Sequence, residues 1–319
     1  MNTLNNKVSR LLPLFLVIFI DSLGYFLVIP VLLHLFLRGE YGLIPSSTSL
    51  ATRNLLYGIT VTLSPLAFLL TAPFIGNFSD KYGRKKIIFW CLVGSLLGFI
   101  LPIIGILNDS LTLLLLGRFI AGVSSGSQPV AQAAIADFTT GKQKAFYLAM
   151  IAFAMTLAMV LGPLGGGYLS DPHLVSWFNA MTPYWAGVVL SLLNIVLLLI
   201  FYSEHRSEQQ KSQPVTLRES SKILFTIIGK SNVRLLLLLL LLIELAWSQY
   251  YQVIFLYLAE FFHYTPAQIG LFTGYIGFWM SLGLTIIYRI AIRYVSIAKI
   301  LRVSVIMITI GFVACTFIP

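Results

Sequence analysis

About nine apolar runs alternate with short polar segments along this chain of 319 residues. A helix needs about 20 apolar residues to cross the hydrocarbon core of a bilayer, and every run is close to that length. The pattern predicts an all-α polytopic membrane protein with about nine spans. The first run carries Asp21 at its centre and has no small-residue cleavage site, so we interpret it as a retained helix and not as a signal peptide. The runs are 11–36, 54–75, 87–107, 111–136, 146–169, 184–202, 235–258, 269–288 and 300–318.

One long polar segment divides these runs into two groups. Residues 203–231 separate six runs within residues 1–202 from three runs within residues 232–319. We interpret the polar segment as a cytoplasmic linker. The chain is then predicted to hold an N-terminal six-helix bundle and a partial C-terminal bundle.

Composition and charge agree with a membrane location. The chain is 58% hydrophobic and only 10% charged, which excludes an ordinary soluble domain. Its net charge of +10 is concentrated in polar segments on one side of the predicted membrane. The positive-inside rule therefore predicts a cytoplasmic N-terminus, which we expect in a bacterial inner membrane, and the charge needs no nucleic-acid partner. Cys91 and Cys315 lie inside apolar runs, so we expect neither a disulfide framework nor a metal site. We also expect no cofactor and no enzyme activity.

Three ionisable residues lie deep in the predicted spans: Asp21, Arg118 and Glu244. Each must be neutralised, paired or exposed to a water-filled cavity, because a charge at the bilayer centre costs about 2.5–3.5 kcal/mol on insertion scales. Asp21 and Arg118 lie at nearly the same depth, so they can form a pair or near-pair. Asp21 and Glu244 occupy matching depths in the first and seventh runs. We therefore predict that all three take part in proton coupling, although a permanent ion pair that only joins two helices would also explain Asp21 and Arg118.

The turn between the second and third runs carries an acid, two glycines and a basic cluster in residues 76–86. This order resembles the loop between helices 2 and 3 of major facilitator superfamily transporters. The resemblance implies twelve helices in two similar halves, so the chain looks truncated after its ninth run. It also implies that the loop gates the cytoplasmic side, with Asp137 as an acceptor for Arg84, although a positive-inside anchor is the simpler alternative. The implied gate residues are Gly76, Asp80, Gly83, Arg84, Lys85 and Asp137.

Two further segments resemble the same superfamily. Arg118 begins a segment similar to a family motif associated with proton transfer, with Ala121 in place of the usual glutamine. The fifth run resembles the glycine-proline motif of the antiporters, especially drug and proton exchangers, and the first run resembles tetracycline and multidrug efflux members. Small residues at every fourth position also form a packing face for another helix, which is the alternative explanation. The motif residues in the fifth run are Ala158, Gly162, Pro163, Gly166 and Gly167.

The substrate cavity is predicted from polar and aromatic residues near these acids. Gln128 and Gln132 follow Arg118 on later turns, while Trp247, Gln249 and Tyr250 follow Glu244. Aromatic faces beside an acid suit a flat amphipathic cation, although aromatic residues also gather at membrane interfaces.

Taken with the resemblance, these residues indicate a proton-coupled antiporter that exports small amphipathic compounds. Its partners would be protons, a small-molecule substrate and the lipid bilayer. The alternatives are a proton symporter for a sugar or organic anion, and an inactive fragment of such a carrier. We also expect either a homo-oligomer or C-terminal helices supplied by another chain.

Overall fold

The computed structural model describes residues 2–38, 43–45, 47–137, 139, 141–202, 231–287, 290–291 and 294–317. This part of the chain consists of helices joined by turns, without strands. Of the predicted linker, only Ser231 lies within the described residues, where it begins a helix. The helices are α1 (Asn2–Arg38), α2 (Leu50–Tyr82), α3 (Arg84–Leu107), α4 (Leu111–Ser124), α5 (Ser127–Asp137), α6 (Gly141–Leu169), α7 (Thr182–Phe201), α9 (Ser231–Phe261), α10 (Pro266–Leu282), the π-helical turn η2 (Gly283–Ile287) and α12 (Ile297–Phe317).

Each predicted span corresponds to helical structure, and six of the helices are individually long and apolar enough to cross a membrane. The fourth predicted span, 111–136, was expected to be continuous, and this expectation is wrong because α4 and α5 are separated by a turn at Ser125 and Gly126. Pro129 explains the break. It has no N–H to donate to the carbonyl of Ser125, and its ring would clash with that carbonyl in a continuous helix. The carbonyl of Ser125 instead accepts a hydrogen bond from the N–H of Gln128, at 3.1 Å.

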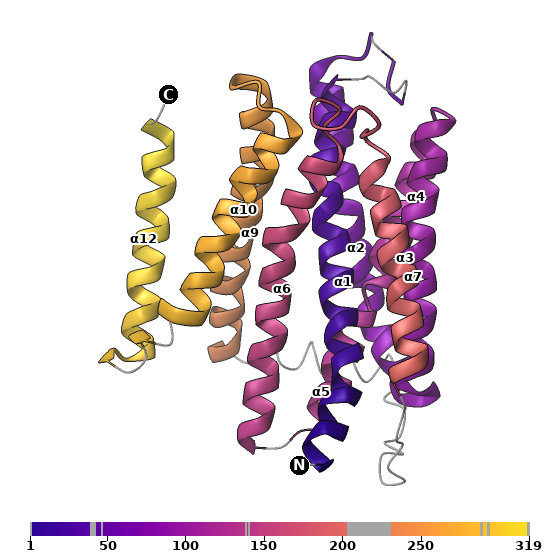
Figure 1. Cartoon of the computed structure of the whole chain (residues 1–319). Coiled ribbons are helices and arrows are strands. Elements are labelled where there is room, and N and C mark those ends of the chain that lie inside the picture. The colour runs from indigo at the N-terminus through magenta and orange to yellow at the C-terminus, as the bar shows by residue number, and fades with distance from the viewer. Residues whose placement is uncertain are drawn as a thin grey trace.

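The helices stand side by side, with α6 between α1 and α10 (Figure 1). Helices α1 to α7 form the first bundle, while α9, α10 and α12 stand on the far side of α6. The α2–α3 turn, with Lys81, Arg84, Lys85 and Lys86, lies at the end of the molecule where α1 begins. We call this the basic end, and the other end of the bundle the distal end.

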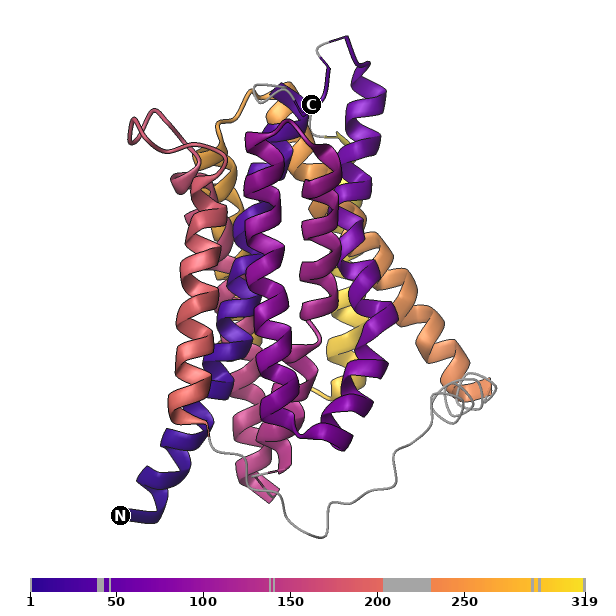
Figure 2. The ribbon, with the colours of Figure 1, turned by 90° about the vertical axis from the view of Figure 1, so that its right-hand side faces the viewer.

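The two helix groups meet at the distal end and separate toward the basic end. The distal buried cluster includes Phe255 of α9 and Ile269 of α10 together with Tyr57 of α2. In the described residues, the buried cluster of the basic half draws only on the first bundle, from Leu11 to Tyr202. Helix α9 also slopes away from the first bundle as it approaches the basic end (Figure 2). Among the described residues, the buried packing between α9 and the first bundle therefore lies toward the distal end.

Candidate functional site

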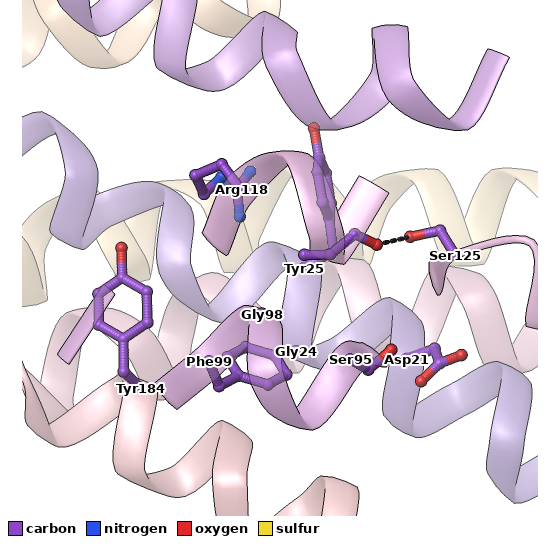
Figure 3. A pocket seen from close by; sticks show the side chains of 10 residues that line it. Asp21, Gly24, Tyr25, Ser95, Gly98, Phe99, Arg118, Ser125 and Tyr184 are labelled. Carbon is purple, nitrogen blue, oxygen red and sulfur yellow. Dashed lines mark hydrogen bonds between the residues drawn. The ribbon is translucent and has the colours of Figure 1, made fainter. Parts of the chain in front are cut away.

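A small cavity within the first bundle is lined by both Asp21 and Arg118 (Figure 3). Asp21 and Tyr25 come from α1, Arg118 from α4 and Tyr184 from α7. The cavity volume is about 30 Å³, which is room for one or two water molecules. Water of this amount could therefore contact both the Asp21 carboxyl and the Arg118 guanidinium. The remaining lining residues are Gly24, Ser95, Gly98, Phe99, Ala121 and Ser125.

Asp21 is held by a serine and not by the arginine. The hydroxyl of Ser127, the first residue of α5, donates a hydrogen bond to the Oδ2 atom of Asp21. Among the described residues, no direct ion pair joins Asp21 to Arg118. Figure 3 shows the two side chains apart, with Asp21 and Tyr184 toward opposite ends of the cavity. In this arrangement the protonation of Asp21 breaks no salt bridge to Arg118, and the roles of the two residues in proton coupling stay a prediction.

Arg118 is almost fully buried, with 3% of its surface exposed. The hydroxyl of Ser64 fixes its backbone by a 2.6 Å hydrogen bond to the Arg118 carbonyl. Its guanidinium carbon lies 5.5 Å from the centroid of the Tyr25 ring, a cation–π contact. The Nε and Nη2 atoms have no hydrogen-bond partner within the described part of the chain. Because a buried charge without hydrogen bonds is costly, these donors favour water or an acidic group in the cavity.

At the basic end, the α2–α3 turn has a backbone conformation that favours glycine. Gly83 has φ 104° and ψ 142°, a conformation that residues with a Cβ atom rarely adopt. Helix α3 begins immediately afterwards with Arg84, whose Nη2 atom lies 2.6 Å from Oδ2 of Asp137 and 3.6 Å from Oδ1 of Asp80. Lys85 donates to the Leu199 carbonyl at 3.1 Å. The turn therefore joins α2, the end of α5 and the end of α7 at one point.

Other predicted gate and cavity residues contribute less to these contacts. Gly76 of α2 has open space where a side chain would project. Gln128 and Gln132 are half-buried on α5, and Gln132 contacts Met155 of α6 at 3.9 Å, but neither lines the cavity of Asp21. Their proposed role in substrate binding stays a prediction.

Helices α1 and α10 pack closely against small residues on two sides of α6. A Cβ atom on Gly162 would lie 2.5 Å from Cβ of Phe26, and one on Gly166 would lie 1.9 Å from the Leu27 carbonyl oxygen. On the other side, a Cβ on Gly270 of α10 would lie 2.6 Å from the Pro163 carbonyl oxygen and 3.3 Å from Gly167. Ala158, one turn before Gly162, is fully buried. Helix α6 is thus in close contact with the first bundle and with α10.

The predicted residues of the seventh span lie elsewhere. Glu244 and Gln249 are exposed on α9, and the structure does not bring them into the cavity of Asp21 and Arg118. Trp247 packs against the distal cluster, and its ring lies 6.1 Å from that of Tyr250. The Tyr250 ring lies 5.3 Å from Phe312 of α12. The roles predicted for this group stay predictions.

A second pocket lies between the first halves of α1 and α6. Its volume is about 420 Å³, and its walls are apolar and aromatic. The side chains that form it include Phe15, Phe19, Tyr147, Phe153 and Leu157. Such a pocket can hold the apolar part of a drug-sized molecule.

Sequence reasoning missed Ser127, Tyr25 and Tyr184 as parts of the site. The signal for Ser127 was present, because Ser124, Ser125, Gly126, Ser127 and Pro129 interrupt an apolar run with small polar residues and a helix breaker. No comparable signal marks the two tyrosines. Their position depends on how α1 and α7 pack around Arg118.

Comparison with protein families decides the classification. Residues 14–319 match the model described as Major Facilitator Superfamily. The chain belongs to this superfamily. Its all-α membrane fold and its resemblance to the drug:proton antiporter group are confirmed, and the members of this superfamily are transporters and not enzymes. Like other members of the major facilitator superfamily, it is an integral membrane protein.

Curated relatives of this superfamily member include resistance proteins. It is 28% identical to the class H tetracycline resistance protein of Pasteurella multocida over 201 residues, which cover 63% of this chain and 46% of that protein. It is 31% identical to the class C tetracycline resistance protein of Escherichia coli over 196 residues, covering 61% and 45% of the two chains. The chain therefore spans less than half the length of these relatives. Among solved structures, a human organic anion transporter has a similar fold, with a TM-score of 0.65, 20% identity and coverage of 87% of this chain and 71% of that one.

Proposed function

We propose that this protein acts in proton-coupled export of small amphipathic compounds. The observation that carries the proposal is the cavity shared by Asp21 and Arg118, because it places a titratable acid and a buried cation within one small space inside a membrane bundle. Ionisable residues at such depth mark ion and substrate pathways in membrane proteins. In this proposal Asp21 carries the proton, and Arg118 responds to the charge that Asp21 gains and loses.

Antiport is favoured over other transport modes by two observations. The relatives include several tetracycline resistance proteins and a Bacillus subtilis multidrug resistance protein. Helix α6 carries the glycine-proline segment that resembles the antiporter motif and packs against α1 one turn beyond Asp21. The apolar pocket between α1 and α6 supports an amphipathic substrate, since it offers aromatic and aliphatic walls to an apolar body.

We further propose that the N-terminus and the basic end face the cytoplasm of a bacterial inner membrane. Lys81, Arg84, Lys85 and Lys86 lie at this end, as the positive-inside rule requires of a cytoplasmic face. The described conformation would then be inward-facing, with the distal cluster closing the outer side. The Arg84–Asp137 ion pair would act as part of the cytoplasmic gate.

The test is accumulation of a fluorescent lipophilic cation, and separately of tetracycline, in cells expressing the chain. Asp21→Asn should restore accumulation to the level of empty cells, and so should a protonophore. Asp109→Asn is a matched control, because Asp109 is an exposed acid in the α3–α4 turn with φ 51°, a conformation that asparagine accepts. Equal accumulation in cells with and without well-expressed protein would refute export of these compounds.

One observation favours a second candidate, uptake of an acidic or hydroxylated substrate with protons. Arg118 directs Nε and Nη2 donors, unpartnered within the described residues, at a buried cavity, and such donors recognise carboxylates. Proton-dependent uptake of a labelled organic acid or sugar, lost in Arg118→Lys, would support this candidate over export.

A further inference from the structure

Helix α5 has a functional contact at each end. Its first residue, Ser127, donates a hydrogen bond to Asp21, and its last residue, Asp137, pairs with Arg84 at 2.6 Å. The helix has 11 residues, so its ends are about 15 Å apart at 1.5 Å per residue. A short rigid helix therefore connects the proton-binding candidate with the basic end.

Helix α5 is a separate rigid segment that is buried in the core of the basic half, where Val130, Ala131, Ala134 and Ile135 belong to its buried cluster. It is separated from α4 by the Ser125–Gly126 turn, because Pro129 interrupts the helical hydrogen bonding. Beyond that break, Ser127 is fully buried, so water does not compete for its hydroxyl. A hydroxyl that donates to a carboxylate favours the ionised form, and this preference disappears when the carboxyl is protonated.

We propose that Ser127 positions Asp21 and that α5 couples the protonation of Asp21 to the Arg84–Asp137 ion pair. The inference rests on the proposed function, in which Asp21 carries the proton. While Asp21 is ionised, Ser127 holds the beginning of α5 against α1. Arg84 holds the end of α5 through Asp137 and also donates to the Val130 carbonyl, at 3.4 Å. When Asp21 takes up a proton the first contact weakens, α5 is free to shift, and the ion pair at the basic end loosens with it.

Other titratable and charged groups lie on the helices around Asp21 and can also affect its protonation. Arg118 of α4, Tyr25 of α1 and Tyr184 of α7 share its cavity. Helix α5 carries only one charged residue, Asp137 at its far end. Helix α6 has lysines only in its first turn, α10 has no charged residue, and the acids and bases of α2 lie in its first and last turns. Ser127 is thus the hydrogen-bond donor to Asp21 that can be removed without changing any charge.

The first experiment follows the carboxyl band of Asp21 by infrared spectroscopy while the pH of the purified chain is changed. Asp21→Asn identifies the band by its loss. In Ser127→Ala, Asp21 should stay protonated to higher pH, with the midpoint raised by about one to two pH units, since a hydrogen bond to a charged group is lost. Ser127→Thr, which keeps a hydroxyl, should restore most of the original midpoint. Ser125→Ala is the matched control, because the Ser125 hydroxyl donates to the Ala121 carbonyl and not to Asp21.

The second experiment tests the coupling through linkage. If α5 connects the two sites, breaking the ion pair by Asp137→Asn should also raise the Asp21 midpoint, by about half a pH unit. Electrostatics alone predicts the opposite sign, because removing a negative charge favours ionisation of Asp21. In the Ser127→Ala background, Asp137→Asn should add no upward shift.

Four results would overturn the proposal. An unchanged midpoint in Ser127→Ala, or an equal shift in Ser125→Ala, would show that Ser127 does not position Asp21. A downward shift in Asp137→Asn, or an upward shift that persists without the Ser127 hydroxyl, would show that α5 does not couple the sites. The titration needs no transported substrate, so its result is independent of whether the chain exports the tested compounds.

Discussion

Gly166 of α6 offers the sharpest test of how the first bundle is packed. A Cβ atom at this position would lie 1.9 Å from the Leu27 carbonyl oxygen of α1. Ordinary carbon–oxygen contacts are about 3.3–3.6 Å, so Gly166→Ala requires α1 and α6 to separate by about 1.5 Å. The neighbouring Gly165 is a matched control, since a Cβ there would meet Cδ1 of Leu27 at 3.9 Å, an ordinary contact.

The expected difference between the two variants can be estimated from general energies. Replacing glycine by alanine inside a helix stabilises it by about 1 kcal/mol at either position. Gly166→Ala adds an overpacking cost of about 1–3 kcal/mol, because the obstacle is backbone and not a flexible side chain. At about 2–4 °C per kcal/mol, the Tm of Gly166→Ala should be roughly 5 °C below that of Gly165→Ala.

Thermal unfolding can be followed with a dye that fluoresces on reaction with thiols, because Cys91 is a buried free cysteine of α3. If both variants melt together above the unaltered protein, α1 and α6 are not in the close contact described here. If both melt equally below it, the effect does not come from the specific contact at Leu27.

Three further predictions concern the two ends of the bundle. Gly83→Ala should lower the Tm by a few degrees and reduce efflux, because φ 104° strains a residue with a Cβ atom by about 1–3 kcal/mol. Arg84→Gln should reduce efflux while changing stability by less than about 1 kcal/mol, since the pair with Asp137 is partly exposed. Glu260→Gln should weaken the 3.5 Å hydrogen bond that Asn54 donates to the Glu260 carboxylate between α2 and α9. The buried distal position of Tyr57 should then become more accessible, so in a Tyr57→Cys background an impermeant thiol reagent added at the distal side should react faster.

Each of these predictions has an opposing outcome. Unchanged Tm in Gly83→Ala would mean that the turn adopts another conformation. Full efflux by Arg84→Gln would mean that the α2–α3 turn serves only as a positively charged anchor and not as a gate. Labelling at Tyr57 that is equal with and without the Glu260 carboxylate would show that apolar packing alone closes the distal end.

The sequence predicted those features that depend on residues close together in the chain. The turn at Gly83 and its charged neighbours follow from local chemistry, because only glycine accepts that backbone conformation readily. The small-residue face at Gly162 and Gly166 also follows from spacing, since positions four apart share one side of a helix. The structure adds which helices occupy that side.

Features that depend on tertiary packing could not be predicted from the sequence. Depth along a helix suggested that Asp21 and Arg118 could approach each other, but only the packing of α1, α4 and α5 determines that Asp21 meets Ser127 instead. Glu244 shares a depth with Asp21, yet it projects from an exposed face of α9. The depth of a residue along its helix can be counted from the sequence, but the direction in which its side chain points depends on how the helix is rotated in the bundle.

The close contacts of α6 also limit how such a protein can diversify. One face of this helix is closed to larger residues by the backbone of α1, and another is closed by α10 at Gly270. The walls of the apolar pocket, including Met150, Phe153 and Leu157, lie outside these two contacts. A changed side chain at these positions would therefore alter the pocket without separating α6 from α1 or from α10, so the pocket can diversify while the helix packing is kept.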